Sequence, residues 1–351
     1  MSFIETEVTG VEARPPPARR ARQPLLLAGP VALLVAAALA ARSAGASDVA
    51  ELETFVLIFV SIVVEALPFI LLGALVSAAV AVYVPERFFE RIGRLPVGLQ
   101  VPGAALGGLV FPVCECGSVP VARRLILRGV HPAAGVAFML AAPVINPIVL
   151  ASTWVAYSGR GSGLEMVLGR AGLGLTLAAL VGIAIGRFGR DTLLRPRPAD
   201  AHSHGHDHAA HGTTRGHWRR GADFVEHVAS DFLFMGKFIV LGAAVAAALQ
   251  TVVPQDIVNG IAGTPVLAAL SLMGLAFMLS LCSEADAFVA VSLTAFSPGS
   301  QLAFLVFGPM VDTKLVLLYG GTFRRQFTLR LMLIAVPFLV VTTLFLDEVF
   351  L

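Results

Sequence analysis

The sequence has few charged residues. Asp, Glu, Lys and Arg make up 14% of its 351 residues, whereas about a quarter of an ordinary soluble domain is charged. A soluble fold cannot hide so much apolar surface. The formal net charge is only +2, which is too small to indicate nucleic acid as a partner. The scarcity of charge therefore excludes a soluble domain and a nucleic-acid-binding protein.

Cysteine is also scarce, and a nucleotide-binding loop is absent. Cys114, Cys116 and Cys282 lie inside apolar stretches, so a secreted scaffold held together by disulfides is not indicated. No Gly-x-x-x-x-Gly-Lys-Ser/Thr run occurs, and ATP-driven transport would therefore need a partner protein. We expect no bound cofactor and no enzymatic activity.

Long apolar runs dominate what is present. About 20 apolar residues, at 1.5 Å each, cross the hydrocarbon core of a bilayer. Such runs indicate a lipid bilayer as the solvent and an all-α protein with many membrane passes. We predict membrane segments near residues 24–41, 54–84, 98–128, 132–158, 165–187, 223–253, 265–296, 299–320 and 326–346.

The N-terminus is predicted to stand apart from the rest. We expect a cytoplasmic leader at residues 1–23 and an extra, uncleaved membrane helix at 24–46. The alternative is a signal peptide cleaved near Ala46, because arginines precede the apolar run and small residues follow it. A polar linker at 190–222 then divides the remaining chain into two parts.

These two parts, residues 54–189 and 223–348, match each other. Several residues recur exactly 166 positions later, and Asn146 is matched by its near-isostere Asp312. Two Ala/Leu/Val-rich segments match leucines by chance, but not Cys, Pro and Phe in one ungapped register. We therefore predict an internal repeat. The recurring pairs include Cys116 with Cys282, Pro132 with Pro298, Phe138 with Phe304 and Pro143 with Pro309.

The distribution of Lys and Arg predicts how the repeats are oriented, because short basic loops favour the cytoplasmic side. All basic loops face that side only if segments 98–128 and 265–296 enter and leave by the same face. We therefore expect two inverted repeats, each with a broken or re-entrant helical hairpin. Such breaks form the midplane site of many secondary transporters. Kinked helices that cross the membrane once are the alternative.

Each predicted hairpin contains a polar break. The first, Phe111–Pro120, has two prolines around the sequence Cys114-Glu115-Cys116-Gly117-Ser118, and proline cannot continue an ordinary helix. The second, Ser280–Asp286, holds a thiol and two carboxylates. Charges inside a bilayer cost several kcal/mol and mark ion or substrate paths. The predicted substrate-binding residues are Cys114, Glu115, Cys116, Ser118, Asn146, Cys282, Glu284, Asp286 and Asp312.

Two roles are open for the cysteines and for the carboxylates. Thiolates select soft metals and metalloids, and the three thiols could meet at one centre, but buried cysteines often only fill space. Glu284 and Asp286 are predicted to couple transport to protons or cations. The alternative is an ion pair with Lys314 or Lys237. We expect Asp312 and Lys314 to face different sides and not to pair, since they lie two positions apart.

Two further acidic residues and the linker have weaker signals. Glu65 and Asp231 either line a cavity or face partner helices. The linker holds a histidine-rich tract, which either binds zinc, nickel or copper or is a solvated connection. Its candidate metal ligands are His202, His204, His206, His208 and His211.

Four motifs together are similar to a known family. They are Phe111–Pro120, Ala137–Pro147, Cys282–Phe288 and Phe307–Lys314. In this order they resemble the bacterial predicted-permease family that includes the ArsP organoarsenical efflux permeases, over roughly residues 54–346. The resemblance implies a bacterial cell membrane location and efflux of trivalent organoarsenicals such as methylarsenite, with Cys114 and Cys116 as ligands. Glu115 departs from the commoner Cys-Ser-Cys form of the family.

The leading hypothesis is a secondary, ion-coupled permease that exports a soft, thiol-reactive small molecule or metalloid. One alternative is a transmembrane thiol/disulfide redox conductor, although one residue between the cysteines, rather than two, counts against it. Another is a divalent-metal permease supplied by the histidine-rich linker. The sequence leaves open whether the chain forms a homo-oligomer.

Overall fold

The computed structural model describes residues 49–111, 113–189, 193–196, 215–252 and 264–350. The chain divides into two compact units, Met1–Glu53 and Thr54–Leu351, and the second holds almost all the described residues. The predicted leader, N-terminal membrane helix and histidine-rich tract lie outside the described residues. In the described part the structure is helical, with only an isolated bridge between Leu194 and Phe323 and no strand.

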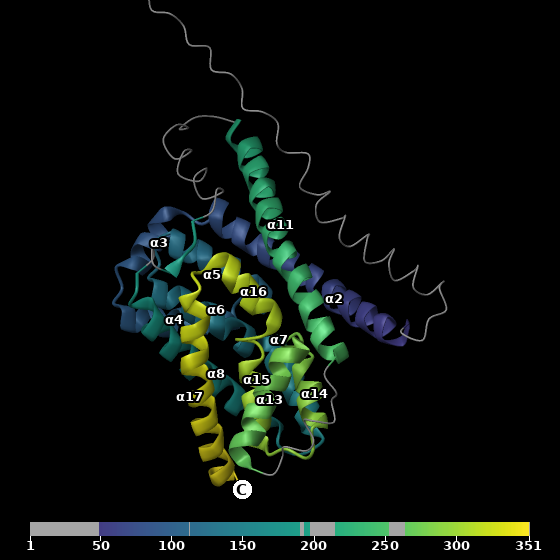
Figure 1. Ribbon diagram of the computed structural model, residues 1–351. Helices are drawn as coiled ribbons and strands as arrows, with labels where there is room; N and C mark the ends of the chain where they lie inside the picture. The colour runs from purple at the N-terminus through teal and green to yellow at the C-terminus, as the bar shows by residue number, and fades with distance from the viewer. Residues whose placement is uncertain (1–48, 112, 190–192, 197–214, 253–263, 351) are drawn as a thin grey trace, which may run out of the picture. The chain divides into compact units, whose positions relative to one another are not determined.

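The described helices fall into two series, one before and one after residues 197–214 (Figure 1). The first series is α2 (Val49–Val82), α3 (Glu86–Gly93), α4 (Val97–Leu106), α5 (Glu115–Leu127), α6 (Pro132–Ile145), α7 (Pro147–Ser158) and α8 (Gly163–Gly186). The second is α11 (Arg215–Val252), α13 (Pro265–Leu279), α14 (Asp286–Ser292), α15 (Pro298–Phe307), α16 (Thr313–Thr322) and α17 (Gln326–Phe350).

Five stretches in the described residues are long and apolar enough to cross a membrane. They are Leu52–Val82, Pro132–Ser158, Gly163–Gly186, Gly221–Thr251 and Gln326–Glu348. Large apolar side chains on the outer faces of these helices are exposed, as lipid contact requires. The predicted all-α membrane architecture is therefore confirmed, and the protein passes the bilayer several times.

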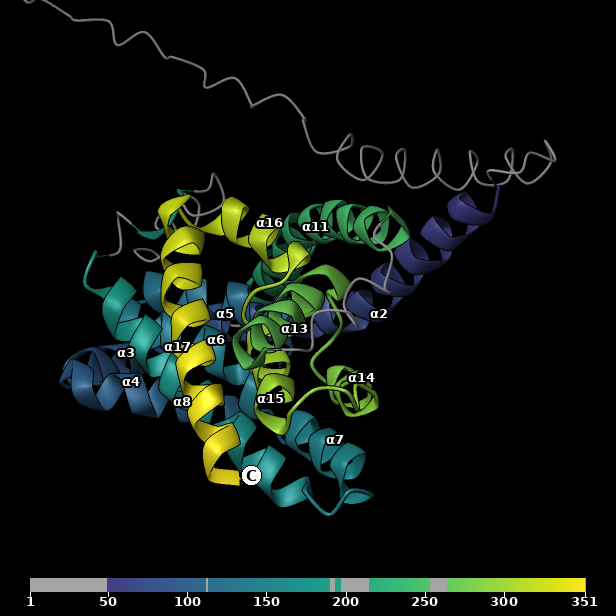
Figure 2. The same cartoon turned by 60° about the horizontal axis from the view of Figure 1, so that its bottom comes forward.

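Helices α6 and α15 form the centre of the fold. Every residue of α6 after Pro132 is buried, and so is every residue of α15 after Pro298. Helices α4, α5 and α8 pack around α6, while α13, α14 and α17 pack around α15 (Figures 1 and 2). A mostly apolar helix that is buried on all sides is typical of the interior of a bundle.

The two arms of the first hairpin pack on α6 in opposite directions. In the α4 arm, the Gln100 side chain accepts a hydrogen bond from the amide of His131, and Gly108 lies against Ala142. In α5, Ser118 bonds the Met139 carbonyl, whereas Ile126 lies against Gly135. The break between the arms therefore lies beside the C-terminal half of α6, and both outer ends lie near its beginning.

The open part of this break is shorter than the sequence predicts. Helix α5 already begins at Glu115, with Cys114 as its extended N-cap residue, and it includes Pro120. The prediction that the backbone opens as far as Pro120 is wrong for Glu115–Pro120. The cysteine pair thus lies at a helix N-terminus rather than in a loop.

The second break begins at Ser280, a non-glycine residue with a φ of 48°. Side chains favour this left-handed region only when local hydrogen bonds support it. The Ser280 hydroxyl donates to the Phe277 carbonyl and accepts from the amide of Thr313. These bonds end α13 and hold the break against the start of α16.

Asn146 and Asp312 occupy equivalent junctions between consecutive helices. Asn146 ends α6, and its side-chain oxygen accepts the Ile148 amide at 3.0 Å to begin α7. Asp312 precedes α16 and accepts the Leu315 amide at 2.6 Å. Both side chains satisfy an amide that the first turn of a helix leaves without a partner.

Glycines allow α2 to approach α5 and α11 to approach α16. A Cβ atom on Gly73 would collide with the backbone of Gly117 in α5, and one on Gly242 would collide with the backbone of Lys314 in α16. Small residues at such contacts let two membrane helices pack closely. The two close contacts bring α2 and α11 next to the start of α5 and the start of α16.

Candidate functional site

A buried group of polar side chains lies where the two breaks meet. We call Glu115, Ser283, Asp312 and Lys314 the Glu115 cluster. No member is more than 2% exposed. The Ser283 hydroxyl, from the second break, donates to Glu115 Oε2 at 3.0 Å. The cluster therefore joins residues from both series of helices.

Lys314 lies between two carboxylates. Its Nζ is 3.7 Å from Glu115 Oε1 and 3.5 Å from Asp312 Oδ2. Neither of these two oxygens has a hydrogen-bond partner among the described residues. The ammonium group is thus held by charge attraction at distances longer than a good hydrogen bond.

The pairing of Lys314 with Asp312 corrects the expectation that they face different sides. That expectation holds for two residues within one helix, which point about 200° apart at 3.6 residues per turn. Asp312, however, precedes α16 with an extended backbone, at φ −131° and ψ 174°. Its side chain therefore turns back over the first turn of the helix, where Lys314 lies.

Helix ends add to the electrostatics of the cluster. Glu115 is the first residue of α5, and a carboxylate at a helix N-terminus is stabilised by the helix dipole. Lys314, in the first turn of α16, has the unfavourable sign for its position. The two carboxylates are therefore what keeps a buried ammonium group at this place.

All three cysteines are buried and free. The Cys114 and Cys116 side chains interact with each other, and Cys282 lies within electrostatic range of Glu115 and Cys116. No three His, Cys, Asp or Glu residues in the described ranges group closely enough to hold a metal ion. The structure thus brings the thiols to the same region without joining all three at one centre.

Asp286 belongs to a second buried network, with an arginine as its partner. Arg170 in α8 is fully buried, and its NH1 and NH2 donate to the two Asp286 oxygens at 2.9 and 2.8 Å. It also donates to Thr153 Oγ1 at 2.9 Å and to the carbonyl of Ser283 at 3.2 Å. A bidentate pair of this kind fixes both charges in position.

Arg170 was not among the residues that the sequence singled out. The alternative of an ion pair is correct for Asp286, but its partner is Arg170 and neither Lys314 nor Lys237. Lys314 is in the Glu115 cluster, and Lys237 is exposed, with its Nζ 4.6 Å from the ring centre of Phe234. A signal was nevertheless present, because an arginine inside a predicted membrane segment marks a functional or paired position.

The other predicted site residues have different surroundings. Glu284 is half-buried, and its Oε2 has no hydrogen-bond partner among the described residues. Ser118 bonds the carbonyls of Glu115 and Met139, and Asn146 caps α7. Ser118 therefore holds α5, which carries Glu115, against α6, and Asn146 connects α6 to α7.

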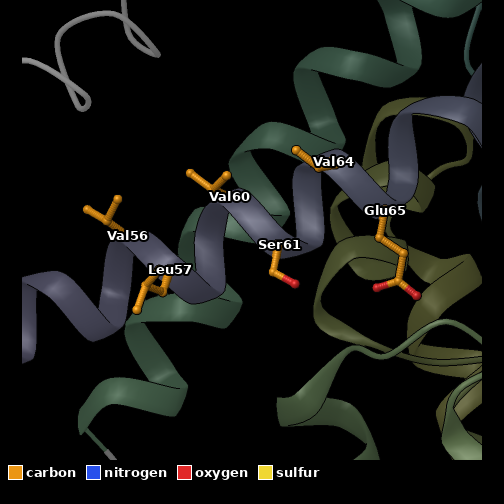
Figure 3. Close-up of a pocket in the computed structure, with 6 residues that line it drawn as sticks. All are labelled: Val56, Leu57, Val60, Ser61, Val64 and Glu65. Carbon is orange, nitrogen blue, oxygen red and sulfur yellow. The ribbon is translucent and has the colours of Figure 1, made fainter.

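Asp231 and Glu65 lie on the two long outer helices. Asp231 accepts the Ser77 hydroxyl at 2.7 Å and pairs with Arg124 at 3.5 Å, so it faces partner helices, one of its two predicted settings. Glu65 ends a row of side chains along α2 that lines an open depression of about 550 Å³ (Figure 3). The rest of this lining is Val56, Leu57, Val60, Ser61 and Val64.

Comparison with known proteins places the chain in a family. The model of the predicted permease family (ArsP_1) matches residues 51–347. UPF0718 protein YcgR of Bacillus subtilis is 43% identical, over 77% of this chain and 89% of its own. A Streptococcus mutans protein, named as a candidate subunit of a two-component membrane permease complex, is 35% identical over 78% and 88%. No solved structure matches the chain.

The extent of these matches agrees with the resemblance that the four motifs indicate. The family model spans both series of helices and both breaks. Each of the two relatives is matched over most of its own length. The chain is therefore a multi-pass membrane permease, and it belongs to the predicted permease family.

Proposed function

We propose that this permease is a secondary, ion-coupled exporter of a soft, thiol-reactive solute, with trivalent organoarsenicals such as methylarsenite as the substrate class. The observation that carries the proposal is that three free, buried thiols lie in the region where the two breaks converge, beside carboxylate oxygens that have no hydrogen-bond partner among the described residues. An open helical break inside a membrane protein is tolerated where it lines a cavity or a path.

The chemistry of the thiols suits such a solute. A dihydroxy organoarsenical exchanges each As–OH bond for an As–S bond, and the proton of each thiol leaves with the hydroxide as water. The neighbouring Cys114 and Cys116 supply two sulfur atoms at the start of α5, and Cys282 supplies a third from the other series. Exchange between these sulfurs is reversible, so the solute can be taken up on one side and passed on.

We also propose that residues 54–189 and 223–348 are inverted repeats with re-entrant hairpins. The helices recur in the same order, and α4 and α13 each pack on the central helix of their own series. Contacts between the series are reciprocal, since α7 packs on α14 and α16 packs on α5. Two repeats related by a two-fold axis, as inverted repeats are, produce this exchange of partners.

The basic residues near the end of α5 support the proposed orientation. Arg128 donates to the carbonyl of Ala81 at the end of α2, and Arg123 donates to the carbonyls of Thr322 and Arg195. The ends of α2, α5 and α16 therefore gather beside residues 193–196, which lie near the start of the predicted cytoplasmic linker. A single basic face is what the positive-inside rule requires.

The hairpin topology can be tested by labelling single cysteines with a membrane-impermeant maleimide. In a background without the three native cysteines, Arg94→Cys and Arg128→Cys flank the first hairpin, and Arg160→Cys follows α7. We expect Arg160→Cys to react in intact cells and the other two only after permeabilisation. Reaction of Arg128→Cys in intact cells, with Arg94→Cys protected, would show a single crossing instead of a hairpin.

Transport by the thiols can be tested with everted membrane vesicles. We expect wild-type vesicles to accumulate methylarsenite and the Cys114→Ser/Cys116→Ser protein to accumulate no more than vesicles without the permease. Met166→Leu, which removes a buried sulfur from α8 at nearly constant volume, is the matched control and should keep wild-type accumulation. Equal flux in the wild type and the double variant would show that the thiol mechanism is wrong.

A further inference from the structure

We infer that Glu115 and Asp312 share one proton around Lys314, and that this proton is the coupling ion of the permease. The proton site follows from the Glu115 cluster alone. Its role in transport rests on the proposed function.

Charge balance is the first argument. With both carboxylates ionised, the Glu115 cluster has a net charge of −1 in a place where no member is more than 2% exposed. An uncompensated ion in such surroundings costs several kcal/mol. One bound proton leaves a carboxylate–ammonium pair and a neutral carboxylic acid. One bound proton therefore balances the charge of the cluster.

The geometry is the second argument. Glu115 Oε1 and Asp312 Oδ2 both face Lys314 Nζ, at 3.7 and 3.5 Å, and both lack a hydrogen-bond partner among the described residues. The other oxygen of each carboxylate is occupied, by Ser283 and by the amide of Leu315. The two unsatisfied oxygens are thus where a proton can be added without breaking a hydrogen bond.

The repeat provides a third argument. At the junction that corresponds to Asp312, Asn146 caps its helix through the same kind of hydrogen bond. An amide is therefore sufficient for capping, and the carboxylate at 312 adds only a charge. The positions 166 residues away from Glu115 and Lys314 are Leu281 and Ile148, and neither residue carries a charge. The charges thus gather in one asymmetric cluster, as a single coupling site requires.

The surrounding groups leave this role to the cluster. Asp286 is neutralised by Arg170 at 2.8 Å, which makes it a poor coupling residue despite the prediction from sequence. No three acidic or soft ligands in the described ranges could hold a metal ion instead. The remaining ionisable side chains within electrostatic range of the cluster or its neighbours are Cys116, Cys282, Glu284, Tyr319 and Glu65.

Coupling follows from the positions of the three charges. Lys314 and Asp312 belong to the same segment, whereas Glu115 lies on α5. If α5 separates from α16, the Lys314–Asp312 pair stays together and Glu115 loses its cation. The shared proton then stays with Glu115, which releases it to water on one side of the membrane and takes up another from the other side before it returns to Lys314. One proton thus enters and one leaves in each cycle.

Infrared spectroscopy of the purified permease in nanodiscs tests the proton site without a substrate. We expect the carbonyl band of a buried, protonated carboxyl group at neutral pH in the wild type. Glu115→Gln and Asp312→Asn should each remove it, because either variant leaves one carboxylate to pair with Lys314. Asp347→Asn, a cap of α15 outside the cluster, should keep it. A wild type without the band, or a band of full intensity in either cluster variant, overturns the inference.

Everted vesicles with methylarsenite as the probe test the coupling. We expect an acid interior to raise accumulation in the wild type, whereas accumulation by Asp312→Asn should not respond to the gradient. Gradient-driven accumulation at the wild-type level in Asp312→Asn overturns the coupling role. A wild type that shows the infrared band and moves no methylarsenite contradicts the proposed substrate and supports the proton site.

Discussion

Arg170→Met is expected to lower the free energy of unfolding by about 3–5 kcal/mol. Arg170 is fully buried and makes a bidentate ion pair with Asp286 while also bonding Thr153 and Ser283. Methionine fills much of the space but leaves the Asp286 carboxylate buried without its cation. The substitution should also remove the hydrogen bonds by which Arg170 links the second break to α7 and α8. Unfolding by sodium dodecyl sulfate in mixed micelles measures the change.

A second substitution distinguishes the lost ion pair from lost packing. Arg170→Met/Asp286→Leu removes both charges, and replacing a buried pair with apolar residues is often close to neutral. We expect the double variant to recover most of the stability. Arg187→Met, an exposed position just after the same helix, should have an effect within about 0.5 kcal/mol. A double variant as unstable as Arg170→Met would attribute the effect to packing.

Lys314→Met is expected to cost about as much at neutral pH, roughly 3–5 kcal/mol. It leaves Glu115 and Asp312 buried and facing the space that the ammonium group occupied. Protonation removes both charges, so the loss of stability relative to the wild type should shrink as the pH falls. Adding Asp312→Asn should restore part of the stability at neutral pH. Detergent unfolding measured across a pH series tests both effects.

Lys237→Met is the matched control for this variant. Lys237 is exposed and lies over the rings of Phe234 and Phe238, a contact that contributes about 0.5–1 kcal/mol. Its replacement should have a small effect that does not depend on pH. If Lys314→Met were no more damaging than Lys237→Met, the Glu115 cluster would not be the charge-balanced unit described above.

Much of the fold could be predicted from the sequence because the signals are local. Apolar length predicts membrane segments, since hydrocarbon accepts only long apolar helices. Proline, glycine and polar residues in the middle of such a segment predict a break, and helices α4 and α5 are separated as expected. The position of the break was less exact, because Pro120 lies inside α5. The local sequence therefore indicates that a break is present more reliably than it indicates where the break begins and ends.

The sequence predicted which residues belong to the candidate site better than it predicted which of them contact one another. Glu115, Asp312 and Cys282 stood out because polar residues are rare in apolar segments. Their partners depend on which helices pack together, and composition says nothing about that. Lys314 seemed directed away from Asp312 only because both were taken as helical, whereas Asp312 is extended.

The sequence by itself determined that this chain is a membrane permease with polar breaks in matching places, because hydropathy, helix-breaking residues and motif spacing act over a few neighbouring positions. Only the tertiary structure decided that Arg170 pairs with Asp286 and that Lys314 lies between Glu115 and Asp312. The physical reason is that a buried charge must find its partner in space. Here Arg170 and Asp286 lie 116 residues apart in the chain, and Glu115 and Lys314 belong to different helices, α5 and α16.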